Sequence, residues 1–221
     1  MTAPPVEAPP PELGLLVELA LADLVASWVS GSAEAVRDAL AATLPELVAL
    51  YGSAAVALGA DWYDELREGA GVDGRFRAIP AVLPDRGRTD SLAGWGVGPL
   101  FQAEPDIPTA QAKVAGGLQR IIADAHRDTV IASLTADPQA AGWRRQTVGE
   151  TCEFCTLIAG RGAVYSAKTA QFASHDDCDC VAVPVWGDAV KVLPYTPSQR
   201  FRSQRARDAN NARIRAALGA T

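Results

Sequence analysis

Apolar residues recur at three- and four-residue intervals through most of the first 135 positions, the spacing of helices with one buried face. The first such stripe comprises Val17, Leu21, Leu24 and Trp28. The residues "SGS" at 30–32 should end this helix, and Ser32 is placed to cap the next one. The first part of the chain is therefore predicted to be helical.

The same periodicity predicts later helices, separated by residues that break helices. These helices are expected over 44–67, 91–102 and 109–134. Pro45 suits a first helical turn, so a new helix is predicted to begin there. Asp90 can cap the short helix, and the Gly-, Pro- and Arg-rich residues 71–90 predict a loop. On the longest helix, His126 is interpreted as a polar-face residue.

The pattern changes after the "TADP" at 135–138. "GWRRQTV" (142–148) and "CVAVPVW" (180–186) are short and rich in β-branched residues, which predicts strands. The predicted fold class is mainly α, with a helical N-terminal region and a small α+β element near the C-terminus. The expected division is a flexible Pro-rich leader 1–11, a helical domain 12–136, the α+β element 137–194 and a basic tail 195–221. The two folded parts are expected to have separate cores.

Composition and charge exclude several classes of protein. Hydrophobic residues make up 48% of the 221 residues, enough for a buried core. The most apolar stretch, "GLLVELALADLVASWVS", carries Glu18 and Asp23, so it predicts a buried helix and no membrane partner. "MTAPPVEAPPPE" has neither the basic start nor the apolar centre of a secretory signal. The cysteines are therefore expected to meet a reducing cytosol, where structural disulfides are rare.

Charge is distributed unevenly along the chain. The net charge is −6, yet residues 195–221 hold six arginines and one aspartate, a net of +5 that leaves −11 on the rest. The tail is predicted to act electrostatically on DNA or on an acidic partner surface. The predicted contact residues are Arg200, Arg202, Arg205 and Arg207.

All four cysteines lie between Thr151 and Cys180 in the spacing C-x2-C-x19-H-x2-C-x-C. A C-x2-C turn places two thiolates at two corners of a zinc tetrahedron, and a second pair from a distant loop closes the other two. Zinc takes four ligands, so one of five candidates is surplus, and spacing does not decide between four cysteines and three cysteines with the histidine. The candidate ligands are Cys152, Cys155, His175, Cys178 and Cys180.

Other functions of a cysteine cluster account less well for these residues. A thioredoxin-type pair would need only Cys152 and Cys155, and two disulfides do not suit the compartment. The order of motifs is the reverse of that in zinc deaminases, and a thiolate-rich site is a poor setting for hydrolysis. We therefore predict a structural zinc that supplies folding energy to the α+β element 137–194, which is thus a zinc-stabilised, zinc-binding element. The core around it is expected to comprise Phe154, Leu157, Ile158, Val164, Tyr165 and Phe172.

The cysteine segment resembles the phage Mu F-type head morphogenesis family of minor capsid proteins. The resemblance rests on Cys152 and Cys155, on "RGAVY" at 161–165, and on His175, Cys178 and Cys180, and it covers about residues 137–187. Many relatives read H-P-x-C-R-C at the last element, where this chain reads "HDDCDC". The proline and the arginine of that pattern are both aspartates here.

The resemblance implies a minor head protein that takes part in phage head morphogenesis near the portal and the packaged DNA. Such a protein would occupy the host cytoplasm during assembly and the head interior of the virion afterwards. Its partners would be portal or capsid proteins, and we expect neither a small-molecule substrate nor enzymatic activity. The alternative is a zinc-ribbon-like nucleic-acid-binding protein or a host-directed regulatory protein.

Overall fold

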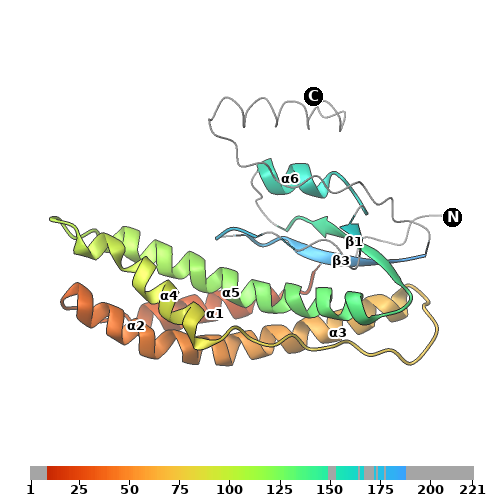
Figure 1. Ribbon diagram of the computed structural model, residues 1–221, viewed down its shortest axis with the longest axis horizontal. Helices are drawn as coiled ribbons and strands as arrows, with labels where there is room; N and C mark the ends of the chain where they lie inside the picture. Colours follow the sequence, from red (N-terminus) through yellow and green to blue (C-terminus); the bar gives the residue numbers. More distant parts are fainter. Residues whose placement is uncertain are drawn as a thin grey trace.

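The computed structural model describes residues 9–148, 153–163, 165–166, 172, 174–176 and 178–187. The elements are α1 (Glu12–Ala26), α2 (Ala33–Leu47), a π-helical turn η1 (Val48–Gly52), α3 (Ser53–Gly69), α4 (Arg86–Gly96), a 3-10 turn η2 (Gly98–Phe101), α5 (Ile107–Ala136), β1 (Ala140–Gln146), α6 (Glu153–Ala159), β2 (Tyr165–Ser166) and β3 (Val181–Trp186). The helices form an elongated bundle, the sheet lies along α5, and α6 lies beyond the sheet (Figure 1). The described part is mainly helical with one small sheet, as predicted.

Helix α2 continues through η1 into α3 without a break. Ser32 caps its start, where its Oγ accepts a hydrogen bond from the Ala35 N–H at 3.3 Å. The predicted helix start at Pro45 is wrong, because this proline lies inside α2. Proline has no N–H to donate to the carbonyl of Ala41, one turn earlier. The guanidinium of Arg86, at the start of α4, donates to that carbonyl instead, at 3.2 Å.

By length and composition, this continuous run of 37 residues, Ala33–Gly69, could cross a membrane. It is the one such helix in the described part of the chain. Core helices of soluble proteins often have the same length and composition, so these two properties are weak evidence for a membrane span. Its inner face contributes Leu40, Leu44 and Tyr63 to the core.

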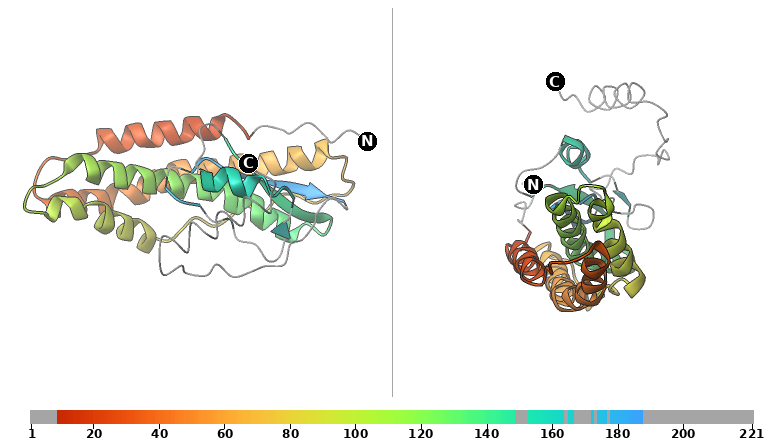
Figure 2. Two further views of the ribbon diagram at one scale, coloured as in Figure 1. Left: turned by 90° about the horizontal axis from the view of Figure 1, so that it is seen from above. Right: turned by 90° about the vertical axis from the view of Figure 1, so that its left-hand side faces the viewer.

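The sheet and the helices share one hydrophobic core. The strands run antiparallel in the order β2-β1-β3, and Pro184 lies in the edge strand β3, where the loss of a donor is tolerated. Trp143 of β1 and Val181 of β3 belong to the same buried cluster as Leu118 and Leu134 of α5. Seen end-on, the sheet lies directly on the helical bundle (Figure 2). The expectation of separate cores is therefore wrong.

The segment between α3 and α4 is an extended strap whose backbone bonds to side chains of the helices. The N–H of Ala78 donates to Asp64 Oδ1 at 2.9 Å, and the N–H of Ile79 donates to Ser133 Oγ at 2.9 Å. The N–H of Ala81 donates to Thr129 Oγ1 at 3.2 Å. These bonds explain why hydroxyl side chains occupy a buried face of α5. The loop predicted over 71–90 is shorter than expected, because α4 begins at Arg86 and includes Asp90.

The carboxylate of Asp137, directly after α5, joins the bundle to the sheet. Its Oδ2 accepts hydrogen bonds from Tyr63 Oη and Arg67 Nε, each at 3.0 Å, and from Trp186 Nε1 at 3.1 Å. Burial tends to raise the pKa of Asp137, but hydrogen bonds from the Gln139 N–H and these side chains outweigh it and lower the pKa. The group is therefore a buried, fully paired carboxylate.

His126 lies in the core, so its assignment to the polar face is wrong. Its side chain is fully buried against the Trp62 ring, with 5.3 Å between ring centroids. Neither ring nitrogen has a hydrogen-bond partner among the described residues. Burial, and secondarily the charge of Arg127, lowers its pKa from 6.5 to about 4. Gly59 permits this close packing of α3 on α5, because a Cβ there would lie 2.9 Å from the His126 carbonyl oxygen.

We expect the pKa of His126 to make folding sensitive to mild acid. The unfolded chain takes up a proton as pH falls through 6.5, whereas the folded chain resists until about pH 4. The stabilisation is full above the ordinary pKa, and the loss should reach about 2 kcal/mol at pH 5. Urea unfolding of the wild type and of His126→Phe, measured between pH 7.5 and 4.5, isolates this loss because other titrating groups are common to both proteins. Parallel pH profiles for the two proteins would contradict the assignment.

Candidate metal centre

Three predicted ligands gather at one point. The ligand atoms of Cys155, His175 and Cys178 all lie within 4.8 Å of one another, an arrangement that could hold a metal ion. Cys155 Sγ is 3.7 Å from His175 Nε2 and 3.7 Å from Cys178 Sγ. Cys155 comes from the first turn of α6, and the other two come from the segment that leads into β3. Both cysteines are buried, whereas the histidine is at the surface.

The backbone fixes the orientation of His175. Its Nδ1 lies 2.6 Å from the carbonyl oxygen of Asp176. A carbonyl only accepts hydrogen bonds, so Nδ1 carries the proton and the lone pair of Nε2 faces the cysteines. Metal-ligating histidines are typically oriented by such a hydrogen bond from the second ring nitrogen.

The remaining candidates are placed differently. Cys180 is buried beside Cys155 and Cys178 and forms a cluster with them on which Phe172 packs, but it lies outside the three-ligand group. Cys152 lies outside the described residues, as do Val164 of the predicted small core and the tail residues Arg200, Arg202, Arg205 and Arg207. Phe154 is 49% exposed, so its assignment to that core is wrong. Successive side chains of a helix are about 100° apart, so Phe154 can face solvent while Cys155 faces inward.

One polar face of α5 holds the segment that carries His175 and Cys178. Arg127, which is 1% exposed, donates from Nε to the Cys180 carbonyl at 2.7 Å and from Nη2 to the Cys178 carbonyl. Asp124 accepts a hydrogen bond from Ser174 at 2.8 Å and pairs with Arg127 at 2.8 Å. The long helix therefore positions this segment through its backbone.

Two further contacts fasten the same segment to α5 nearer the surface. Gln119 donates to Asp179 at 2.8 Å, and Arg120 pairs with Asp176 at 3.5 Å. Both pairs are partly exposed, so each contributes little to stability by itself. Together with Arg127 they hold the ligand segment against the helix.

The sulfur atoms lie in a positively charged environment. Arg145 Nη1 is 3.8 Å from Cys155 Sγ and 4.0 Å from Cys178 Sγ. A hydrogen bond from the Cys180 thiol, helped by the charge of Arg127, lowers the pKa of Cys178 despite burial. The same hydrogen bond raises the pKa of Cys180. Thiolates are the form of cysteine that binds metals, so this environment favours a metal site.

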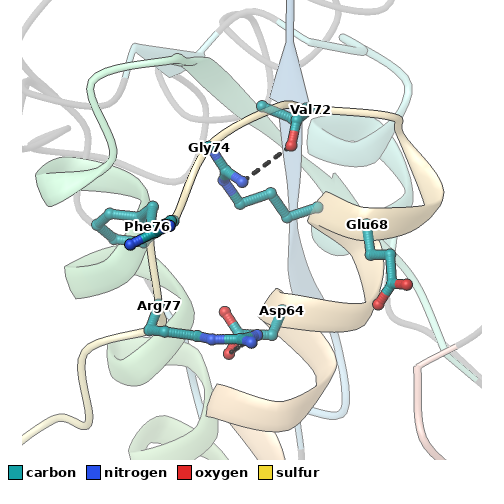
Figure 3. Close-up of a pocket in the computed structure, with 8 residues that line it drawn as sticks. Asp64, Glu68, Val72, Gly74, Phe76 and Arg77 are labelled. Carbon is teal, nitrogen blue, oxygen red and sulfur yellow. Dashed lines mark hydrogen bonds and ion pairs between the residues drawn. The ribbon is translucent and has the colours of Figure 1, made fainter.

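A cavity of about 470 Å³ lies where α3 meets the strap (Figure 3). Three of its charged groups, Asp64, Arg67 and Arg77, are bonded within the chain. Arg67 donates to the carbonyl oxygens of Val72 and Asp73, each at 3.0 Å, and Arg77 pairs with Asp64 at 3.4 Å. These bonds hold the strap in place, and we assign no ligand to the cavity.

A family model described as VG15 protein matches residues 12–205. The chain belongs to the VG15 protein family. Membership of this viral gene product family suggests that the chain is a phage or viral protein. Comparisons of this VG15 family member with curated proteins and with solved structures found no match.

Sequence reasoning missed two residues of the VG15 protein's centre, Arg127 and Arg145. A signal for Arg145 was present, because side chains alternate along a strand and Arg145 shares the inward face of Trp143. The side chains of Arg145 and Trp143 are both buried, at 3% and 1% exposure. Nothing in the spacing of α5 distinguishes Arg127 from the other polar residues of that helix, because its partners are backbone carbonyls from a distant segment.

Proposed function

We propose that this protein is a phage minor head protein that takes part in head morphogenesis, carries one structural zinc ion, and docks near the portal. The observation that carries the proposal is the gathering of Cys155, His175 and Cys178, at motif positions that resemble the Mu F-type family, in a member of a viral protein family. The role is a binding role without catalysis. The protein would act in the host cytoplasm during assembly and remain in the head interior.

The distances between the ligand atoms support zinc. A tetrahedral zinc with usual bond lengths separates two sulfurs by about 3.8 Å, and a sulfur from a histidine nitrogen by about 3.6 Å. The corresponding distances here are both 3.7 Å. Cys152 or Cys180 would supply the fourth ligand. A set of four protein ligands leaves no open position for a substrate or a reactive water, which is typical of structural zinc.

Zinc is expected at about one ion per chain in protein purified without chelators. Cys155→Ser should lose that zinc and unfold at a lower urea concentration, because the sheet shares its core with the helices. Phe154→Ser, which changes the exposed neighbour of Cys155, is the matched control and should keep both zinc and stability. Elemental analysis and urea unfolding measure the two effects. Equal zinc content in all three proteins would refute the site.

The exposed face of α1 supports docking on a partner. Leu15 and Leu19 are 56% and 55% exposed, and Ala22 and Ala26 continue the same stripe. Glu12 and Glu18 flank it, and the first 36 residues contain no lysine, arginine or histidine. A helix that is apolar on almost every side is usually covered on every side. The partner surface should therefore be a helix with an apolar stripe between basic residues.

Docking is tested by co-expression with the portal and capsid proteins of the same phage. The protein should co-purify with one of them, and the double variant Leu15→Lys, Leu19→Lys should lose that partner while its far-UV circular dichroism stays unchanged. Leu50→Lys is the matched control, since this leucine is 62% exposed but lies outside the α1 stripe. Mass spectrometry of purified virions should find the protein at low copy number. Absence from virions and proheads would refute the head role and favour a host-directed regulatory protein.

The basic tail supports an additional contact with packaged DNA, because its charge of +5 contrasts with −11 on the rest of the chain. Removing residues 198–221 should abolish binding to mixed-sequence duplex DNA at low salt. The affinity of the full chain should fall steeply as salt rises, since each phosphate contact releases counterions. Electrophoretic mobility shifts over a salt series measure both effects. A full chain with no salt-dependent binding would leave an acidic protein surface as the partner of the tail.

A further inference from the structure

We propose that Arg145 compensates the negative charge of a thiolate-rich metal centre and thereby sets its preference for thiolate-binding metals. The inference rests on the proposed zinc site and deepens it. Arg145 is a positioning residue rather than a ligand, since a guanidinium has no lone pair to offer a metal.

The location of Arg145 is fixed by its strand. Within β1, Trp143 and Arg145 point to the same face, toward the cysteines, and Arg145 pairs in register with Ala182 of β3. The guanidinium lies 3.8 Å from the centre of the Phe172 ring, and Phe172 packs on the cysteine cluster. The positive charge is therefore held beside the sulfurs by both the backbone and an aromatic ring.

The charge of the centre follows from its ligands. A divalent ion bound by one neutral histidine and three thiolates carries a net charge of −1. A buried net charge is unfavourable unless an opposite charge lies close to it. Arg145, 3.8 Å and 4.0 Å from two of the sulfurs, supplies that charge. Arg127 adds a second positive charge behind the carbonyls of Cys178 and Cys180.

This arrangement selects a class of metal. Thiolates bind zinc, cobalt(II) and cadmium strongly, whereas magnesium and calcium prefer oxygen ligands. A fixed guanidinium stabilises the thiolate form and so favours the first class. The arrangement also requires at least three thiolates, because a centre of two thiolates, His175 and a water would be neutral and would gain nothing from the added positive charge.

Arg144 provides a matched control within the same strand. Its side chain points to the opposite face of β1, is half-buried, and donates to Gln146 Oε1 at 3.0 Å. Substitution of Arg144 and of Arg145 by glutamine removes the same charge from neighbouring positions, but only the second change affects the sulfurs.

The experiment measures zinc affinity of the full chain by competition with a chromophoric chelator at fixed pH. Arg145→Gln should bind zinc about 10- to 100-fold more weakly, the range found when groups that support metal ligands are removed. Arg145→Lys should recover much of the affinity because it keeps the charge, and Arg144→Gln should match the wild type. An Arg145→Gln protein with wild-type affinity would overturn this inference and leave the zinc site intact. A wild type that binds no zinc would overturn both.

A second measurement needs no variant and so does not depend on the folding of Arg145→Gln. Cobalt(II) bound to the wild type should show sulfur-to-metal charge-transfer absorption of the intensity given by three or more thiolates. A spectrum with two thiolates would overturn the charge argument, since a centre of two thiolates, His175 and a water is neutral.

Discussion

The buried carboxylate of Asp137 is the constraint on which the arrangement of bundle and sheet depends. Its Oδ2 accepts hydrogen bonds from α3, through Tyr63 and Arg67, and from the end of β3, through Trp186. A carboxylate buried without these partners would be strongly destabilising, so the three elements must meet at this point. The end of α5, the start of β1 and the end of β3 are thereby fixed relative to α3, and the rest of the sheet follows.

The ligand segment is held at one end and along its length. At one end it continues into β3 and so reaches Asp137, and along its length Arg127 binds the carbonyls of Cys178 and Cys180. Because β3 also contributes Val181 and Ala182 to the common core, the metal centre is not an independent unit. A metal that binds only the folded chain stabilises everything that unfolds with the centre. The ion would therefore stabilise the bundle as well as the cysteine segment.

The sequence predicted those features that depend on local patterns. Helical periodicity gave α1 and α5, β-branched runs gave β1 and β3, and the C-x2-C and H-x2-C spacing indicated the residues that gather in the centre. It failed where distant groups decide the outcome. A proline inside a helix leaves the carbonyl one turn earlier without its usual donor, and Arg86 supplies a donor in the case of Pro45. The short elements α6 and β2 have too few residues for a period to be seen.

The error at His126 has a different cause. The helical spacing placed His126 on the buried side of α5, but it was assigned to the polar face because histidine is a polar residue. His126 lies four residues after Ile122 and four before Val130, on the buried side of α5, and all three are buried. Arg127, the next residue, is buried on another side of the same helix. Helix α5 thus presents an apolar face to the bundle that includes α1 and a polar face to the ligand segment. A partner on α1 would therefore sense the metal through the stability of α5 rather than by touching the centre.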